Sequence, residues 1–91
     1  MTVFELKPMH DRAKSFYGKA TVFQNLSGKY ILKSYQTDVC YIDSEGLHRT
    51  WDGYSVTTLR HVDEFSRQIL GKPVNKKTWC AMEVEPKAFI V

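Results

Sequence analysis

The sequence predicts an α+β domain in which a four-stranded antiparallel sheet, connected as a meander, is covered on one face by a single amphipathic helix. Turn residues separate short segments of alternating apolar and polar character between positions 14 and 51. A capped helical pattern follows from Ser55 to Gly71, and a second cap signal occurs at Asn75. With 91 residues and 43% hydrophobic composition, the chain is expected to form one domain with one modest core.

The first part of the chain gives an incomplete signal. Residues 1–13 mix charges with isolated apolar residues around Pro8, which leaves either a short edge strand or a loose arm. Strand-like alternation then runs from Lys14 to Gln24. One face carries Phe16, Gly18, Ala20 and Val22, where the helix is expected to pack, and the other carries Tyr17, Lys19, Thr21 and Phe23.

Three more strands are expected, each preceded by a turn or an interruption. The segment from Asn25 to Gly28 is a turn signal, and the second strand, Tyr30 to Tyr35, places Ile31, Lys33 and Tyr35 on one face. Polar residues interrupt it before a third strand, Val39 to Ile42. The turn from Asp43 to Gly46 leads into a fourth strand, Leu47 to Trp51, and the Asp43 side chain is expected to bond backbone amides there.

The main helix has clear start and stop signals. Ser55 is a good N-cap, Gly71 suits the left-handed C-terminal position, and Pro73 cannot continue the helix. At about 100 degrees per residue, the core side is predicted to carry Thr58, Leu59, Val62, Phe65, Ser66, Ile69 and Leu70. The outer side is predicted to carry Arg60, Glu64, Arg67 and Gln68, with ion pairs between Arg60 and Glu64 and between Asp63 and Arg67.

The C-terminal part is predicted to contain a short second helical turn. Asn75 can cap residues 76–79, and Trp79 is expected to close the core. The last residues, Phe89, Ile90 and Val91, are apolar and suit either an edge strand or docking against a partner, including a second copy of the chain.

Charge, hydropathy and cysteine content limit the partners and the location expected for this protein. A net charge of +3 permits nucleic-acid binding without implying it. The sequence shows no signal peptide and no apolar stretch of membrane-spanning length, so a cytoplasmic protein is expected, in a bacterium or another host cell. Cys40 and Cys80 are expected to be buried thiols.

No residue cluster predicts catalysis, a metal or a cofactor. His10, His48 and His61 do not stand at metal-motif spacing from each other or from the cysteines. A Cys40 nucleophile with His48 or His61 as its base would need an oxyanion-hole motif, and the sequence has none. The expected function is therefore binding without chemistry.

Two candidate surfaces remain, and each also has a purely structural interpretation. Where the last strand turns into the helix, Arg49, Trp51, Tyr54, Arg60 and His61 are candidates for partner binding. In the structural interpretation, the aromatic residues of this set pack the corner between the strand and the helix and bind no partner. On the sheet face away from the helix, Tyr17, Lys19, Lys33 and Tyr35, with Thr21, combine rings and ammonium groups as single-stranded nucleic acids require. Tyr and Thr also simply favour strands.

Several separated blocks carry a family resemblance. KSFYGKA from Lys14, LKSYQT from Leu32, WDGYSVTTLRHVDEF from Trp51 and KKTW from Lys76 resemble a family of small proteins of unknown function from phages, plasmids and integrated elements of Gram-positive bacteria. The resemblance runs from Lys14 to Met82 and leaves the N-terminal arm and the tail outside.

The resemblance implies a mobile-element accessory role. We expect an inhibitor of a host defence complex, such as a CRISPR effector, whose partner is a host protein or ribonucleoprotein in the bacterial cytoplasm. A nucleic-acid-binding module is the alternative.

Overall fold

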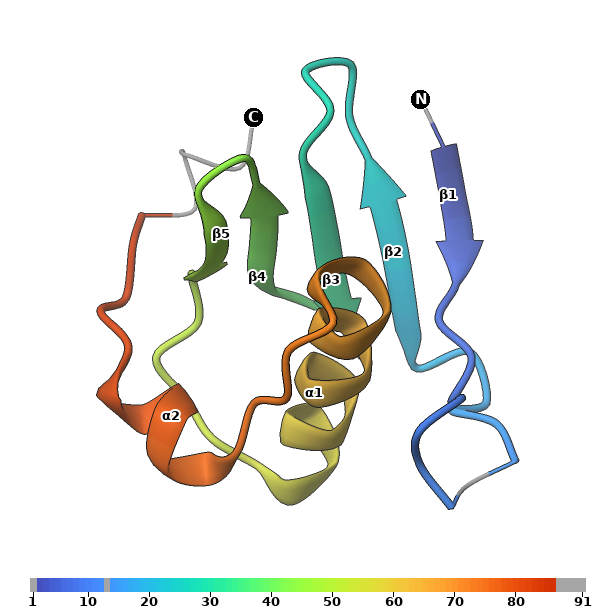
Figure 1. Cartoon of the computed structure of the whole chain (residues 1–91). Helices are drawn as coiled ribbons and strands as arrows, with labels where there is room; N and C mark the ends of the chain where they lie inside the picture. The colour runs from blue at the N-terminus through green and yellow to red at the C-terminus, as the bar shows by residue number, and fades with distance from the viewer. Residues whose placement is uncertain (1, 13, 87–91) are drawn as a thin grey trace.

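The described residues, 2–12 and 14–86 of the computed structural model, form one antiparallel sheet with two helices (Figure 1). The sheet has five strands in the order β1-β2-β3-β4-β5, and neighbours in the sequence are neighbours in space. The α+β meander is confirmed, with one strand more than predicted. The strands are β1 (Thr2–Glu5), β2 (Ala20–Gln24), β3 (Tyr30–Ser34), β4 (Thr37–Asp43) and β5 (Gly46–Arg49).

The extra strand, β1, comes from the segment whose sequence pattern left an edge strand and a loose arm open. It pairs with β2 from Thr2 opposite Gln24 to Glu5 opposite Thr21. The chain then continues as an arm over the main helix, and Leu6 at its start is 1% exposed in the core. The N-terminal segment is thus both an edge strand and an arm, and the arm is docked.

The strand predicted from Lys14 begins only at Ala20. Tyr17 and Gly18 have φ angles of 54° and 73°, in the left-handed region, so the chain turns at these residues. Phe16 is nevertheless buried, as predicted for the core face. The prediction failed here because regular alternation continues through a turn that carries no Asn, Asp or Pro signal.

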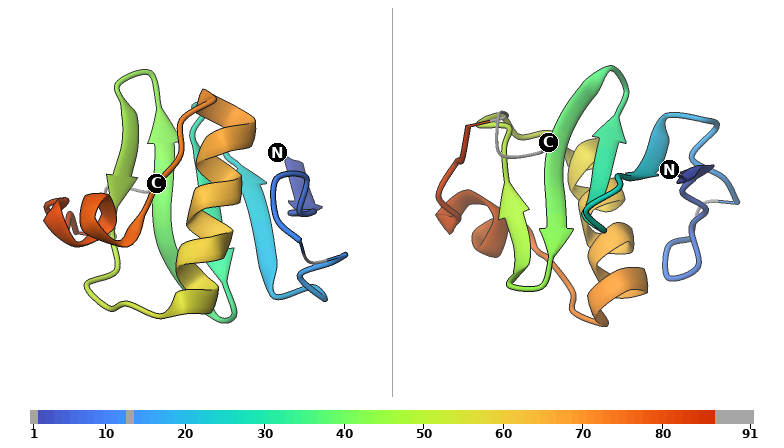
Figure 2. Two further views of the ribbon diagram at one scale, coloured as in Figure 1. Left: turned by 60° about the horizontal axis from the view of Figure 1, so that its bottom comes forward. Right: turned by 90° about the horizontal axis from the view of Figure 1, so that it is seen from above.

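The helix α1 (Val56–Leu70) has the predicted caps. The Ser55 hydroxyl accepts a hydrogen bond from the Thr58 amide at 3.0 Å, and Gly71 adopts φ 71°. Figure 2 shows α1 lying across one face of the sheet, where it contacts β3 and β4. The predicted core side is confirmed, because Val62 and Phe65 are fully buried.

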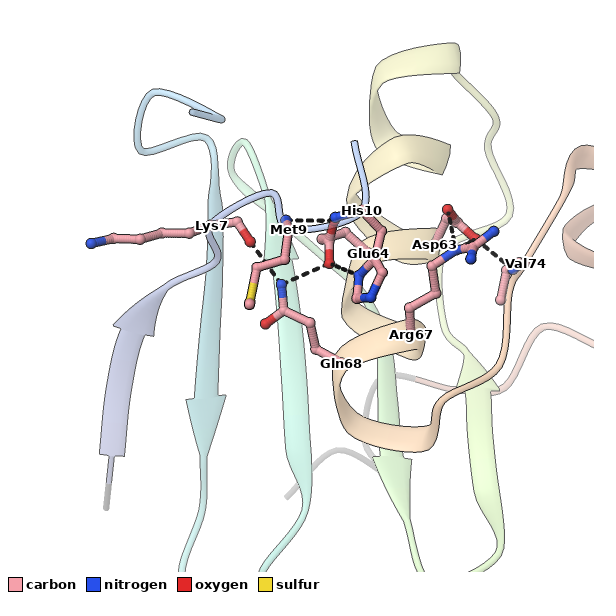
Figure 3. A network of polar contacts seen from close by, with 8 residues as sticks. All are labelled: Lys7, Met9, His10, Asp63, Glu64, Arg67, Gln68 and Val74. Atoms are coloured by element: carbon pink, nitrogen blue, oxygen red, sulfur yellow. Dashed lines mark hydrogen bonds and ion pairs between the residues drawn. The ribbon is translucent and has the colours of Figure 1, made fainter. Parts of the chain in front are cut away.

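Glu64 was expected on the exposed side of α1, and this was wrong. It is 1% exposed because the arm folds over it (Figure 3). The carboxylate accepts hydrogen bonds from the amides of Met9 and His10 and from the His10 ring. The Arg60–Glu64 pair does not form, since Arg60 pairs with Asp11 of the arm instead. The predicted pair of Asp63 with Arg67 is present at 3.0 Å.

The short helix α2 (Lys76–Ala81) is capped by Asn75, whose side chain accepts from the Thr78 amide at 2.8 Å. Trp79 is 1% exposed and closes the core at this end, as predicted. The described helices include none that is both long and apolar enough to cross a membrane. The predicted role of Phe89, Ile90 and Val91 lies outside the described residues.

Candidate binding surface

The sheet face opposite α1 is hollowed between β1 and β3. We call this hollow of about 980 Å³ the open-face groove. Its apolar lining is Val3, Phe23, Leu26 and Ile31, and its polar lining includes Thr21, Asn25, Lys33, Gln36 and Asp38. Leu26 is 89% exposed and Val3 is 61% exposed, so apolar side chains here are open to solvent. Exposed apolar side chains around a hollow are typical of binding surfaces.

The strand register explains this lining. Val3 lies opposite Phe23, and Phe23 lies opposite Ile31. Residues directly opposite each other in an antiparallel sheet point to the same face, so these three side chains form one row across β1, β2 and β3. The next row along the strands joins Thr21 with Lys33 and continues to Asp38. The groove therefore has an apolar row beside a polar row that ends in one positive and one negative charge.

The other half of this face, over β4 and β5, is closed by a polar cluster. Tyr41 and His48 stack with ring centroids 4.6 Å apart. Glu85 accepts from the Tyr41 hydroxyl at 2.8 Å and contacts His48 Nδ1 at 2.6 Å. Asp43 contacts His48 Nε2 at 2.8 Å. Both ring nitrogens are thus used within the protein, and the groove lies over β1 to β3 and the first residues of β4.

The electrostatics of this cluster favour a charged His48. Burial lowers the pKa of His48, but hydrogen bonds with Glu85 and Asp43 outweigh it, so the pKa is raised overall. The Tyr41 hydroxyl bond, with that from His48, lowers the pKa of Glu85. Asp43 also accepts from the Glu45 amide at 2.9 Å, which confirms its predicted role in the turn.

Two exposed tyrosines lie in turns near the groove: Tyr35 is part of its lining, and Tyr17 precedes the lining residue Gly18. Tyr17 and Tyr35 are the described non-glycine residues with positive φ, at 54° and 57°. They are 78% and 47% exposed. The Tyr35 amide donates to the Lys19 carbonyl at 2.7 Å, and the Lys19 ammonium lies 5.6 Å from the Tyr35 ring centroid. Left-handed backbone is costly for bulky residues, and such strain is concentrated at functional sites.

A buried histidine lies beneath Tyr35. The ring centroids of His61 and Tyr35 are 5.9 Å apart, and His61 also contacts Phe16 edge-on at 4.6 Å. Ser34 Oγ lies 2.8 Å from His61 Nδ1 and 3.1 Å from Thr58 Oγ1. Burial and the nearby Arg60 charge lower the pKa of His61 to about 4. The ring is therefore neutral at pH 7, and it packs between the core and the Tyr35 ring.

The structure divides the first predicted surface. Arg49 is 5% exposed; it donates to the carbonyls of Trp51, Gly53 and Trp79 and lies 4.6 Å from the Trp79 ring. Trp51 is half-buried and contacts Gly53 so closely that a Cβ there would lie 2.3 Å from the indole. These contacts hold together the corner between β5, α1 and α2.

The other three members of that set lie apart from this corner or on its surface. Tyr54 is exposed, with the Lys76 ammonium 5.0 Å from its ring. Arg60 is exposed and donates to Asp11 at 2.9 Å. His61 is buried beneath Tyr35, so it belongs to the support of the second surface.

Part of the second predicted surface stays together at the groove. Lys19 and Tyr35 are in contact, Lys33 lies on the groove wall, and Tyr17 stands at the turn beside Gly18 of the same wall. The set was predicted as one strand face, but Tyr17 and Tyr35 reach it from turns. The apolar row was not recognised as a site from the sequence, although alternation had placed Phe23 and Ile31 on this face.

The thiols and histidines add no second site. Cys40 is buried, and burial raises the pKa of its thiol, whereas Cys80 is exposed, contrary to prediction. Cys80 lies near the end of α2, a helix too short to bury both of its faces. In the described part of the chain, no group of three or more His, Cys, Asp or Glu side chains is arranged to hold a metal ion.

A family model, described as a family of unknown function, DUF8033, matches residues 4–81. The chain belongs to the DUF8033 family. No curated protein and no solved structure matches the chain. The DUF8033 match begins ten residues before the first block that suggested a family, so the N-terminal arm was wrongly placed outside it. The matched region contains Phe4 of β1, the docked arm and all of α1.

Proposed function

We propose that this chain acts by binding a partner protein in the open-face groove and carries out no chemistry. The observation that carries the proposal is the apolar lining of the groove, where Val3 and Leu26 are open to solvent beside the more buried Phe23 and Ile31. Tyr35 in the lining of the groove adds a large amphipathic ring of the kind that dominates protein interfaces. Opposite charges at Lys33 and Asp38 favour a partner of mixed charge over a polyanion.

We further propose that this binding inhibits a host complex in the bacterial cytoplasm, such as a CRISPR effector. The support is the chain's small size and its resemblance to proteins of phages and mobile elements. A chain of 91 residues that offers a preformed groove is suited to occupying a surface that the complex needs.

Affinity capture with matched variants tests the proposal. The tagged chain is incubated with lysate of a Gram-positive bacterium, with and without nuclease, and the captured proteins are identified by mass spectrometry. Leu26→Asp places a charge on the apolar lining of the groove, while Val56→Asp places one at another exposed apolar residue, 65% exposed, on α1. We expect capture of one complex that resists nuclease, is lost with Leu26→Asp and is retained with Val56→Asp. Equal capture by both variants would contradict the use of the groove.

A nucleic-acid-binding module is the second candidate, favoured by the contact of Lys19 with Tyr35 and by the exposure of Tyr17. Bases would stack on the two rings while Lys19 and Lys33 meet phosphates. Fluorescence anisotropy with an oligothymidine probe at several salt concentrations tests it. Two phosphate contacts predict a slope of log affinity against log salt of roughly −1.4. An unchanged affinity in Lys33→Ala would count against this module.

A further inference from the structure

One edge of the sheet has no neighbour among the described residues. The outer edge of β5 is occupied, because Val84 forms a parallel bridge with Arg49 and the Glu85 amide donates to the Arg49 carbonyl at 2.7 Å. Within residues 2–12 and 14–86, β1 at the opposite edge pairs only with β2 (Figure 1). Its four residues are all exposed, including Val3 at 61% and Phe4 at 38%. Such an edge is a template for another strand.

The free hydrogen-bonding groups of β1 can be assigned from the ladder. The Leu6 amide donates to the Ala20 carbonyl at 2.9 Å, so the backbone groups of Leu6 face β2. In an antiparallel ladder these directions alternate from residue to residue. The groups of Phe4 therefore also face β2, while the N–H and C=O of Val3 and Glu5 point outward from the sheet.

We propose that β1 pairs antiparallel with β1 of a second copy, about a two-fold axis beside Phe4. In this register Val3 of each copy lies opposite Glu5 of the other, and each such pair exchanges two N–H···O=C bonds. The outward groups of both residues are thereby satisfied in both copies. The two Phe4 side chains meet at the close, non-hydrogen-bonded position, where opposite Cα atoms are about 4.5 Å apart.

Self-complementarity favours a second copy over a foreign strand. The axis is perpendicular to the sheet, so α1 lies on the same side in both copies and the two open-face grooves become neighbours. The Glu5 carboxylates face Val3 rather than each other, which avoids direct like-charge contact. A strand of four residues buries less than the ~1,200 Å² of a standard interface. The dimer is thus weak and dependent on concentration.

Sedimentation equilibrium of the full chain, from about 10 μM to about 1 mM, tests the pairing. We expect the mass to rise reversibly towards that of a dimer. Val3→Pro removes an outward N–H without affecting the β1–β2 ladder, and we expect it to weaken dimerisation about tenfold. Val3→Ala retains the N–H and serves as the control. Circular dichroism checks that both variants fold. A chain that stays monomeric over this range would overturn the proposal.

Disulfide trapping tests the register and uses the Cys80→Ser background, because Cys80 is exposed. We expect Phe4→Cys to form a covalent dimer under mild oxidation, since its Cα spacing suits a disulfide. Val3→Cys, which faces Glu5 of the other copy, is expected to stay largely uncross-linked. Equal or faster trapping of Val3→Cys, or a dimer that neither cysteine traps, would overturn the pairing. The pairing would also be overturned if the β1 amides became protected from hydrogen exchange only when a foreign protein is added.

Discussion

Glu64 holds His10 by two hydrogen bonds. Its Oε1 accepts from the His10 amide at 2.6 Å and its Oε2 contacts the ring Nδ1 at 2.8 Å (Figure 3). Gln68 extends this contact, donating to Glu64 at 2.8 Å and to the Lys7 carbonyl at 2.7 Å. One buried carboxylate on α1 thus organises the whole arm that follows β1.

Glu64→Gln is therefore expected to loosen the arm. The amide cannot accept all the donors that now converge on the carboxylate, and the free energy of unfolding should fall by about 2 kcal/mol. Urea denaturation measures the loss, and proteolysis after Arg12 or Lys14 reports on the arm itself. Asp63→Asn, on the neighbouring residue of α1, is the control for charge removal. Equal protease resistance in Glu64→Gln and the native chain would contradict this role.

Acid should have the same effect as this substitution. Burial raises the pKa of Glu64, but hydrogen bonds from His10, Gln68 and the Met9 amide outweigh it and lower the pKa overall. A carboxyl group with a folded-state pKa below its unfolded value stabilises the fold above the unfolded value, and that stability is lost as the pH falls through the folded pKa. We expect the protection factors of the arm amides, which are corrected for the intrinsic exchange rate, to fall below about pH 4.5. In Glu64→Gln this pH dependence should disappear.

Protonation of His61 in the unfolded chain should lower stability at mildly acidic pH. Because burial lowers its pKa from 6.5 to about 4, the unfolded chain binds more protons between these values. The contribution is complete above pH 6.5 and is lost as the pH falls towards 4. Chemical denaturation from pH 7.5 to 4.5 measures this slope. His61→Gln, which keeps a hydrogen-bonding group near Ser34, should have a shallower slope, and an unchanged slope would exclude His61 as its source.

The tyrosine turns should be more stable with glycine than with alanine. At Tyr17 and Tyr35 both substitutions remove the ring, but only glycine relieves the left-handed φ. We expect each Gly variant to exceed its Ala counterpart by about 1 kcal/mol in free energy of unfolding. At Tyr54, which is not among the residues with positive φ, the order should reverse or vanish. Equal free energies of unfolding for Tyr17→Gly and Tyr17→Ala would show that the left-handed backbone at this position is not strained.

Arg49 should not tolerate lysine. Its guanidinium donates to three carbonyls and stacks on Trp79, a geometry that an ammonium group cannot reproduce. We expect Arg49→Lys to lower the free energy of unfolding by roughly 2–3 kcal/mol, measured in urea. Arg67→Lys, at an exposed helix pair, should change it by less than about 0.5 kcal/mol.

Features that depend on local signals, such as the helix caps, could be predicted from the sequence. Features that depend on contacts between distant residues could not. Ser55, Gly71 and Asn75 act within one turn of their own position, so their roles could be read from the sequence. Glu64 could not be placed correctly, because its burial depends on residues more than fifty positions away. The left-handed Tyr17 was missed because regular alternation of apolar and polar residues continues through its turn, and Gly18 fits that alternation as a small residue of the core face. The groove combines both cases: alternation predicts Phe23 and Ile31 on its face, but not Val3, which needed the pairing of β1.

The docked arm also constrains the order in which the chain matures. Its partners on α1 lie between 49 and 61 residues downstream, from Asp11 with Arg60 to Lys7 with Gln68. During synthesis the arm leaves the ribosome before α1, so its partners are absent until α1 has emerged. The arm is thus among the last segments to reach its final position, and Leu6 stays exposed until the rest of the core has been made.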